Sequence, residues 1–184
     1  MNIIETDQPF PLDLTTAKDR TFQKLHLSTI YTDIEKKLFG GPRETDNALW
    51  AQTGFLWERA LADAFQREYP YIIRPSEVEL DGIVGSPDGI NLLDDFLEEY
   101  KCTWKSTKNA SPGQVWKWLT QTKGYCKMLG LLTCRFRIWY INGGYGKGEE
   151  FGPIYKEYVV QYTQTEVDEN WVMIVQHAKE MEWL

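Results

Sequence analysis

The sequence predicts an α/β domain with a central mixed β-sheet flanked by helices. Its 184 residues suit one domain with a sizeable core. Segments with apolar residues at helical spacing alternate with short runs rich in β-branched and aromatic residues. Their order is helix, helix, several strands, helix, two strands, helix, which is typical of a mixed sheet covered by helices. We expect residues 1–184 to form a single domain, with residues 1–23 as an irregular N-terminal arm.

Two helices are predicted before the first strand. Ser28 can cap a helix over residues 28–39, and Gly40 can end it. Asp46 can cap a longer helix that Pro70 closes. The apolar positions of the two helices are Ile30, Ile34, Leu38, Phe39, Leu49, Trp50, Phe55, Leu56, Ala60, Leu61 and Phe65.

The middle of the chain is predicted to form β-structure. Strands are expected over residues 71–74, 78–84, 88–92 and 96–103. Gly85-Ser86 is expected to turn the chain, and the last two strands form a hairpin around Leu93-Asp94 or Asp95.

The last third returns to alternating helix and strand. The expected elements are a helix at residues 111–129, paired strands at 131–141 and 153–162, and a helix at 165–183. Ser111-Pro112 opens the first of these helices and Gly130 ends it, while Thr165 caps the second.

Several protein classes are excluded or disfavoured by composition. No apolar run reaches the roughly 18 to 20 residues of a membrane span, and residues 1–13 lack the pattern of a secretory signal. The three cysteines, Cys102, Cys126 and Cys134, cannot supply a four-cysteine zinc site or iron–sulfur cluster within one chain. We expect a cytoplasmic protein with reduced thiols, no membrane association and no iron–sulfur cluster.

Charge is distributed unevenly along the chain. The net charge of −7 alone argues against a nucleic-acid binder. Residues 101–147, however, hold nine of the 20 basic residues and none of the 27 acidic ones. Chance clustering is one explanation of this basic block, and a surface that faces a polyanion is the other, which we favour. Trp104, Trp116 and Trp118 lie in the block; most are expected in the core, and one is a candidate to stack on a base.

The candidate catalytic residues lie in the predicted hairpin. Residues alternate between the faces of a strand, so Glu99 and Lys101 share one face while the side chain of Tyr100 points to the other. A tight turn at Leu93-Asp94 would place Asp88 directly across from Glu99. A slip of one residue would separate these side chains.

Two neighbouring carboxylates repel each other unless a cation neutralises them. Mg²⁺ favours such a pair, together with a carbonyl and several waters. Lys101 could then orient the attacking water, help to remove its proton or offset charge in the transition state. The alternative is a surface hairpin with ordinary solvated charges.

Pro87-Asp88 followed by Glu99-Tyr100-Lys101 resembles the signature of the PD-(D/E)XK nuclease superfamily. The segment from Gly54 to Glu58 resembles the upstream helix of that superfamily, and Gln121 to Tyr125 resembles its Gln-x-x-x-Tyr motif. Together these motifs are similar to the branch that holds lambda-type exonuclease and RecB-type nuclease domains. The resemblance covers about residues 28–140.

The resemblance implies a restriction-endonuclease-like core and a set of site residues. Glu58, Asp88, Glu99 and Lys101 would be catalytic. The metal ligands would be Asp88, Glu99, the Tyr100 backbone carbonyl and Glu58, which would hold a metal-bound water or a second ion. The residues expected to help place the metal site or contact DNA are Gln121, Tyr125, Lys105, Lys108, Lys117 and Lys123. The cofactor would be Mg²⁺, with Mn²⁺ able to substitute.

The expected function is metal-dependent DNA exonuclease activity in viral or prophage recombination, repair or processing. A site- or structure-specific endonuclease and a non-catalytic nucleic-acid-binding module are the alternatives. The resemblance also allows a homo-oligomer and a recombination or single-strand-annealing protein as partners.

Overall fold

Two β-sheets form the framework of the structure, a computed structural model that describes residues 24–40, 48–144 and 152–184. The larger sheet has the strand order β2-β5-β6-β7-β8. Its strands are β2 (Ile72–Ile73), β5 (Gly89–Asn91), β6 (Phe96–Thr103), β7 (Thr133–Tyr140) and β8 (Ile154–Gln161). β6 and β7 run parallel, whereas the other neighbours are antiparallel, so the sheet is mixed as predicted.

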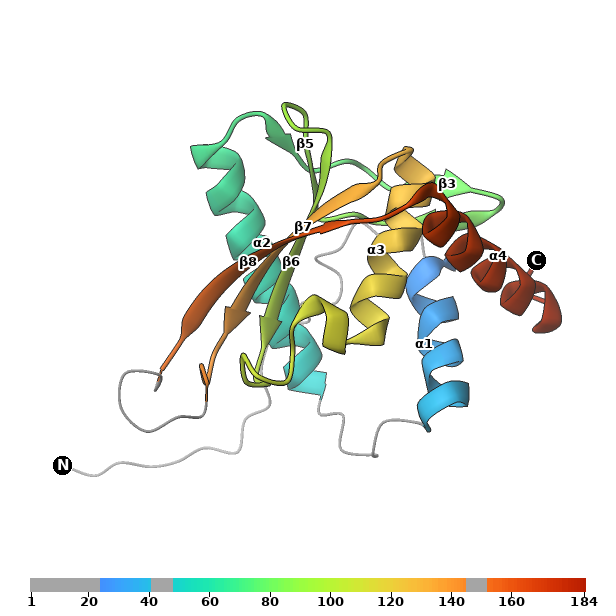
Figure 1. The fold of residues 1–184 in the computed structure, drawn as a ribbon, viewed down its shortest axis with the longest axis horizontal. Helices are drawn as coiled ribbons and strands as arrows, with labels where there is room; N and C mark the ends of the chain where they lie inside the picture. Colours follow the sequence, from blue (N-terminus) through green and yellow to red (C-terminus); the bar gives the residue numbers. More distant parts are fainter. Residues whose placement is uncertain (1–23, 41–47, 145–151) are drawn as a thin grey trace, which may run out of the picture.

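Helices cover both faces of the larger sheet. α2 (Ala48–Glu68) lies on one side, and α1 (Leu27–Phe39), α3 (Trp116–Leu129) and α4 (Gln164–Glu180) lie on the other (Figure 1). A short 3₁₀ helix, Pro112–Gln114, precedes α3. This arrangement confirms the predicted fold class. Within the described ranges, no helix has the length and apolar character needed to cross a membrane.

The β5–β6 hairpin has the register that the sequence predicted. Gly89 pairs with Glu98 and Asn91 with Phe96, which leaves a turn of four residues between the strands. Asp95, the last residue of the turn, has a φ of 55°. The Asn91 side chain accepts hydrogen bonds from the backbone N–H groups of Leu93 and Asp94, and these bonds fix the turn.

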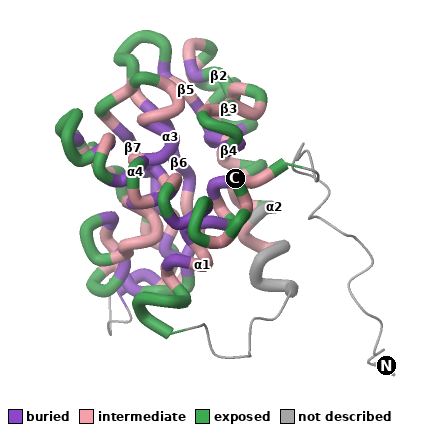
Figure 2. The backbone as a smooth tube through the Cα atoms, turned by 90° about the vertical axis from the view of Figure 1, so that its right-hand side faces the viewer, coloured by how far each residue is buried: buried purple, intermediate pink, exposed green. Residues whose placement is uncertain are grey.

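The core lies between the larger sheet and the three-helix side, where the buried segments of β6, β7 and α3 run close together (Figure 2). Its fully buried members include Leu27 and Ile30 of α1, Phe136 and Ile138 of β7, and Ile174 of α4. Gly124 allows α1 to approach α3, because a Cβ there would stand 2.7 Å from Leu27. The core thus fixes α3, which supplies part of the candidate site.

The predicted strand over residues 78–84 is wrong as a single element. The structure has two antiparallel strands, β3 (Val78–Leu80) and β4 (Ile83–Gly85), joined by Asp81-Gly82. Both turn residues have positive φ, 51° and 76°, which suits a two-residue hairpin turn. β1 (Leu25–His26), which the local pattern did not predict, pairs parallel with β4. Asp81 is therefore a turn residue.

The helix ends require three corrections. The helix predicted over residues 111–129 is divided, because the 3₁₀ helix ends at Gln114 and α3 begins at Trp116. α1 begins at Leu27 with His26 as its N-cap, so Ser28 lies inside the helix. α4 is capped by Thr163, whose side chain accepts from the Glu166 N–H, and not by Thr165. Of the described apolar positions predicted for the first two helices, four are exposed: Leu38, Phe39, Leu56 and Ala60.

Some predictions fall on parts of the chain that the structure does not describe. Asp46 and the N-terminal arm over residues 1–23 lie outside the described residues, as do the side chains of Leu49, Trp50 and Phe55.

Candidate active site

Asp88 and Glu99 face each other across the hairpin. Continuing the register beyond the Gly89–Glu98 pair places Asp88 opposite Glu99 and Pro87 opposite Tyr100. Asp88 is 6% exposed and Glu99 is 0% exposed. The Tyr100 N–H donates to Asp88 Oδ2 at 3.0 Å, which ties the aspartate to the strand that carries the glutamate.

Pro87 leaves the Tyr100 carbonyl unused by the β-ladder. In a strand, the N–H and C=O of one residue point to the same edge, and the Tyr100 N–H points to Asp88. The residue that should pair there, Pro87, has no N–H to donate. The carbonyl therefore points to the edge where Asp88 lies, as the sequence predicted.

Lys101 lies within this acidic cluster. Its ammonium forms an ion pair with Glu99 and donates to Gln121 Oε1 of α3 at 3.2 Å. Burial alone would lower the pKa of Lys101, but the charges of Glu99, Glu58 and Asp88 outweigh it and hold the pKa well above its ordinary value. The side chain is therefore a cation in this structure, suited to orienting a water or offsetting negative charge.

Gln121 links Lys101 to Tyr125. Its amide Nε2 donates to the Tyr125 hydroxyl at 3.2 Å, one turn further along α3. Burial raises the pKa of the Tyr125 hydroxyl well above its ordinary value, so that the hydroxyl stays neutral. Smaller contributions in the same direction come from the nearby Tyr31, Glu99 and Asp88. Tyr31 of α1, which is buried, also acts electrostatically on Lys101 and Tyr125; the local sequence pattern did not reveal it.

Glu58 approaches from the opposite side of β6. Glu58 lies on α2 and is half-buried, and its charge acts on Lys101. It also acts on Cys102: burial and, to a smaller extent, the charge of Glu58 raise the pKa of that thiol to about 11. Among the residues that the structure describes, no three His, Cys, Asp or Glu side chains converge as a metal-binding group. Glu58 comes from α2 and Glu99 lies on the α3 side of β6, where it acts on Cys126, and the charges of both carboxylates act on Lys101.

The remaining donors still suit a hard divalent cation. Asp88, Glu99 and the Tyr100 carbonyl offer only oxygen atoms, and Mg²⁺ commonly binds through one or two carboxylates while keeping several waters. The two carboxylates are buried, so a cation beside them would meet little competition from bulk solvent. The residues present therefore fit such an ion.

The other face of β6 holds a buried ion pair that the sequence did not predict. Arg137 of β7 is 4% exposed and donates to the fully buried Glu98 at 2.7 Å. Its guanidinium lies 4.1 Å from the centre of the Phe65 ring of α2, and Phe65 stacks on Tyr100 at 5.4 Å. These contacts attach α2 to the strand that carries the catalytic residues.

The basic block does not form one continuous surface. Arg137 is buried, and Lys123 and Lys127 pair with Glu166 and Asp168 at the start of α4. Lys117 pairs with Glu35 at 3.4 Å. Of the lysines expected to contact DNA, Lys105 and Lys108 are exposed on the loop after β6.

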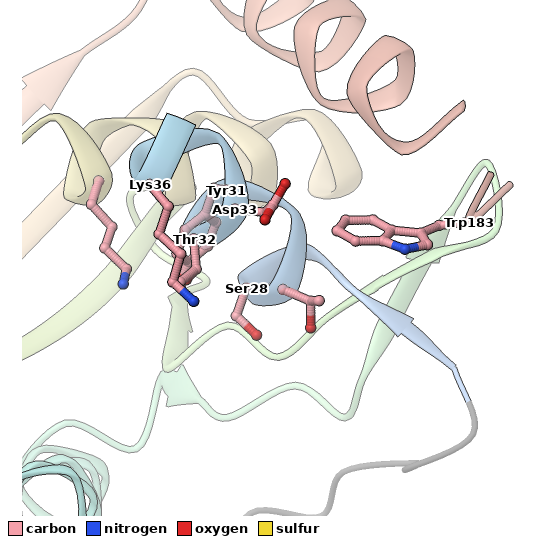
Figure 3. Close-up of a pocket in the computed structure, with 8 residues that line it drawn as sticks. Ser28, Tyr31, Thr32, Asp33, Lys36 and Trp183 are labelled. Atoms are coloured by element: carbon pink, nitrogen blue, oxygen red, sulfur yellow. The ribbon is translucent and has the colours of Figure 1, made fainter. Parts of the chain in front are cut away.

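A pocket of about 440 Å³ lies along the first turns of α1. Its lining residues are Ser28, Thr29, Tyr31, Thr32, Asp33, Lys36, Lys117 and Trp183. Figure 3 shows Lys36 beside Thr32, and the Trp183 ring from the C-terminal segment facing α1. Tyr31 forms part of the pocket wall, and the Lys117 ammonium lies 5.5 Å from the centre of its ring.

Comparison with known proteins gave structural matches only. No protein-family model matches the sequence, and no curated protein does. The structure is similar to an alkaline exonuclease, LHK-Exo, from Laribacter hongkongensis, with a TM-score of 0.56 and 16% identity over 86% of this chain and 88% of that chain. LHK-Exo in complex with dAMP matches with a TM-score of 0.57 and 17% identity over the same shares of the two chains.

A phage-related exonuclease from Haemophilus somnus 129PT is also similar, with a TM-score of 0.53 and 13% identity over 84% of this chain and 79% of that chain. At these identities the similarity establishes the fold. The chain shares the fold of these exonucleases, and this fold fits the predicted resemblance.

Proposed function

We propose that this protein is a metal-dependent deoxyribonuclease that hydrolyses phosphodiester bonds from DNA ends. The observation that carries the proposal is the pairing of Asp88 with Glu99 beside the Lys101 ammonium. Cleavage of a phosphodiester requires a site for a metal ion, an activated water and a cation near the phosphate, and this arrangement can supply each of them.

Each side chain has a role that follows from its contacts. Asp88, Glu99 and the Tyr100 carbonyl would hold the ion, which is Mg²⁺ or, as a substitute, Mn²⁺. When bound, that ion would polarise a phosphoryl oxygen and lower the pKa of a water. Lys101, held by Gln121, would offset the charge that develops on the phosphate. Glu58 would act from the α2 side on a water or a second ion.

Exonuclease action is preferred to endonuclease action because the similar structures are exonucleases, one of them in complex with dAMP. A role in viral or prophage DNA recombination, with a homo-oligomer or an annealing partner, remains an expectation from the resemblance.

Cleavage assays on three DNA forms test the proposal. End-labelled linear duplex, linear single strands and covalently closed circles are incubated with Mg²⁺, with EDTA as the metal-free control. An exonuclease releases nucleotides from linear DNA only when Mg²⁺ is present, and it leaves closed circles intact. Cutting of the circles would instead establish the endonuclease.

The Lys101→Ala variant connects cleavage to the site. It removes the ammonium from the cluster and should lower the cleavage rate at least a hundredfold, as loss of a charge-stabilising group does. Lys179→Ala, which removes an exposed lysine of α4, is the control. A Lys101→Ala protein as active as the control would refute the assignment.

A further inference from the structure

The loop that follows β6, the strand that carries Glu99 and Lys101, exposes an aromatic side chain. Trp104 is 43% exposed, and Lys105 next to it is also exposed. Trp104 comes three residues after Lys101, or about 10 Å along the direction of β6 at the usual rise of a strand. An exposed tryptophan and a lysine therefore directly follow the end of the strand that carries the candidate site.

This loop is attached to the fold. The Lys105 N–H donates to Thr103 Oγ1 at 3.1 Å, and the Thr107 N–H donates to the Gly143 carbonyl at 3.1 Å. Asn142 Nδ2 donates to the Trp104 carbonyl at 3.4 Å. Ser106 is 3% exposed, so the loop is anchored directly after Trp104 and Lys105. Trp104 is presented to solvent from a fixed backbone, although burial of its ring would be favourable.

We infer that Trp104 is a stacking platform for a base of the DNA strand in the site, with Lys105 contacting the neighbouring phosphate. The inference rests on the proposed function for its substrate class. An indole ring stacks on any base, and a lysine beside it suits the backbone of the same strand. Stacking on one ring face requires a base that has left the duplex, so Trp104 favours an unpaired strand end.

Binding without chemistry tests this inference. The full chain, in EDTA, is titrated into a labelled single strand of about 12 nucleotides and into an abasic strand of equal length, and fluorescence anisotropy is recorded. The wild-type protein should bind the strand with bases about tenfold more tightly than the abasic strand, within the range known for one base–aromatic stack. Trp104→Ala should bring this ratio close to one, and Trp104→Phe should keep most of it.

Two controls separate stacking from charge and from general damage. Lys105→Ala should weaken binding of both strands by the same factor, because both carry the phosphates. Leu93→Ala removes a 71% exposed apolar side chain at the opposite end of β6 and should leave both affinities unchanged. Circular dichroism confirms that each variant is folded.

The inference is overturned if Trp104→Ala keeps the wild-type ratio, or if the wild-type protein shows no preference for bases. Failure of the proposed function would be seen separately, as the absence of Mg²⁺-dependent release of nucleotides by the wild-type protein.

Discussion

At Tyr100, a single residue serves one face and one edge of β6. Its ring stacks on Phe65 and attaches α2, while its N–H holds Asp88 in place. Its carbonyl remains available to the site because Pro87 cannot pair with it. The Pro-Asp dipeptide therefore has a physical purpose: the proline frees a backbone oxygen and the aspartate takes the N–H beside it.

The site was partly predictable from sequence at this scale. Asp88, Glu99 and Lys101 could be placed together because strand alternation and a short turn fix their relation locally. The positions of Tyr31 and Glu58 relative to Lys101 could not be predicted, since each depends on how a helix distant in sequence packs in the fold. The Arg137–Glu98 pair was missed because a buried charge has no local pattern.

A single-atom change at Tyr125 tests the positioning of Lys101. Tyr125→Phe removes the hydroxyl that accepts from Gln121 and leaves the Gln121 amide less constrained. A neutral hydrogen bond contributes about 1 kcal/mol, so kcat should fall about fivefold, while KM stays unchanged. Steady-state kinetics measure both constants. Tyr158→Phe, which removes a hydroxyl near Tyr140, is the control, and an equal effect in both variants would contradict this role.

At the scale of elements, the packing of α2 against the sheet decides where Glu58 lies. Trp57, the preceding residue, stacks on Trp139 of β7 with ring centres 5.7 Å apart and planes 19° apart. Trp139 pairs with Cys102, the residue that responds to the Glu58 charge. The stack therefore sets the position of Glu58 along β6.

Removal of this stack should change the metal requirement as well as stability. Trp139→Ala should displace Glu58 and raise the Mg²⁺ concentration needed for half-maximal rate. It should also lower kcat about tenfold, which is equivalent to about 1.4 kcal/mol. Trp139→Phe keeps an aromatic partner and should retain most of the activity. Cleavage rates across a Mg²⁺ series measure the effect. An unchanged metal dependence in folded Trp139→Ala protein would show that the stack has only a structural role.

The start of α4 offers a direct test of a corrected boundary. Thr163→Ala removes the capping box with Glu166 and should lower the free energy of unfolding by about 1 kcal/mol. Thr165→Ala, two residues later and exposed, should change it by less than about 0.5 kcal/mol. Urea unfolding compares the two variants. A larger loss at Thr165 would return the cap to the position expected from the sequence.

At the scale of the whole molecule, three lysines of the basic block form ion pairs with acidic residues that are distant in the sequence. The sequence carries a net charge of −7, yet Lys117, Lys123 and Lys127 find partners on α1 and α4. Element types and the mixed sheet were predictable, because apolar periodicity is local. The pairing of α3 lysines with α4 acids was not, because it depends on the long-range packing of these helices.

The contact between α1 and α4 predicts a dependence of stability on pH. The hydrogen bond from His177 lowers the pKa of Asp33 from its ordinary 3.8. Desolvation opposes this shift in part, and the charge of Lys37 adds to it. A lowered carboxyl pKa stabilises the fold above 3.8, and that contribution disappears as the pH falls through the lower folded value. Urea unfolding of the wild type and of Asp33→Asn across acidic pH measures it. The difference between them should shrink toward zero below 3.8, and a difference that grows there would contradict the prediction.

Isothermal titration with Mg²⁺ or Mn²⁺ tests the central claim most directly, because it asks whether Asp88 and Glu99 hold a divalent ion beside Lys101. The wild-type protein should bind the ion, and Asp88→Asn should lose at least tenfold in affinity because a neutral amide replaces one of two carboxylates. Asp95→Asn changes an acid in the turn of the same hairpin and should bind as the wild type does. Equal binding by Asp88→Asn and the wild type, or no binding by the wild type, would contradict the account.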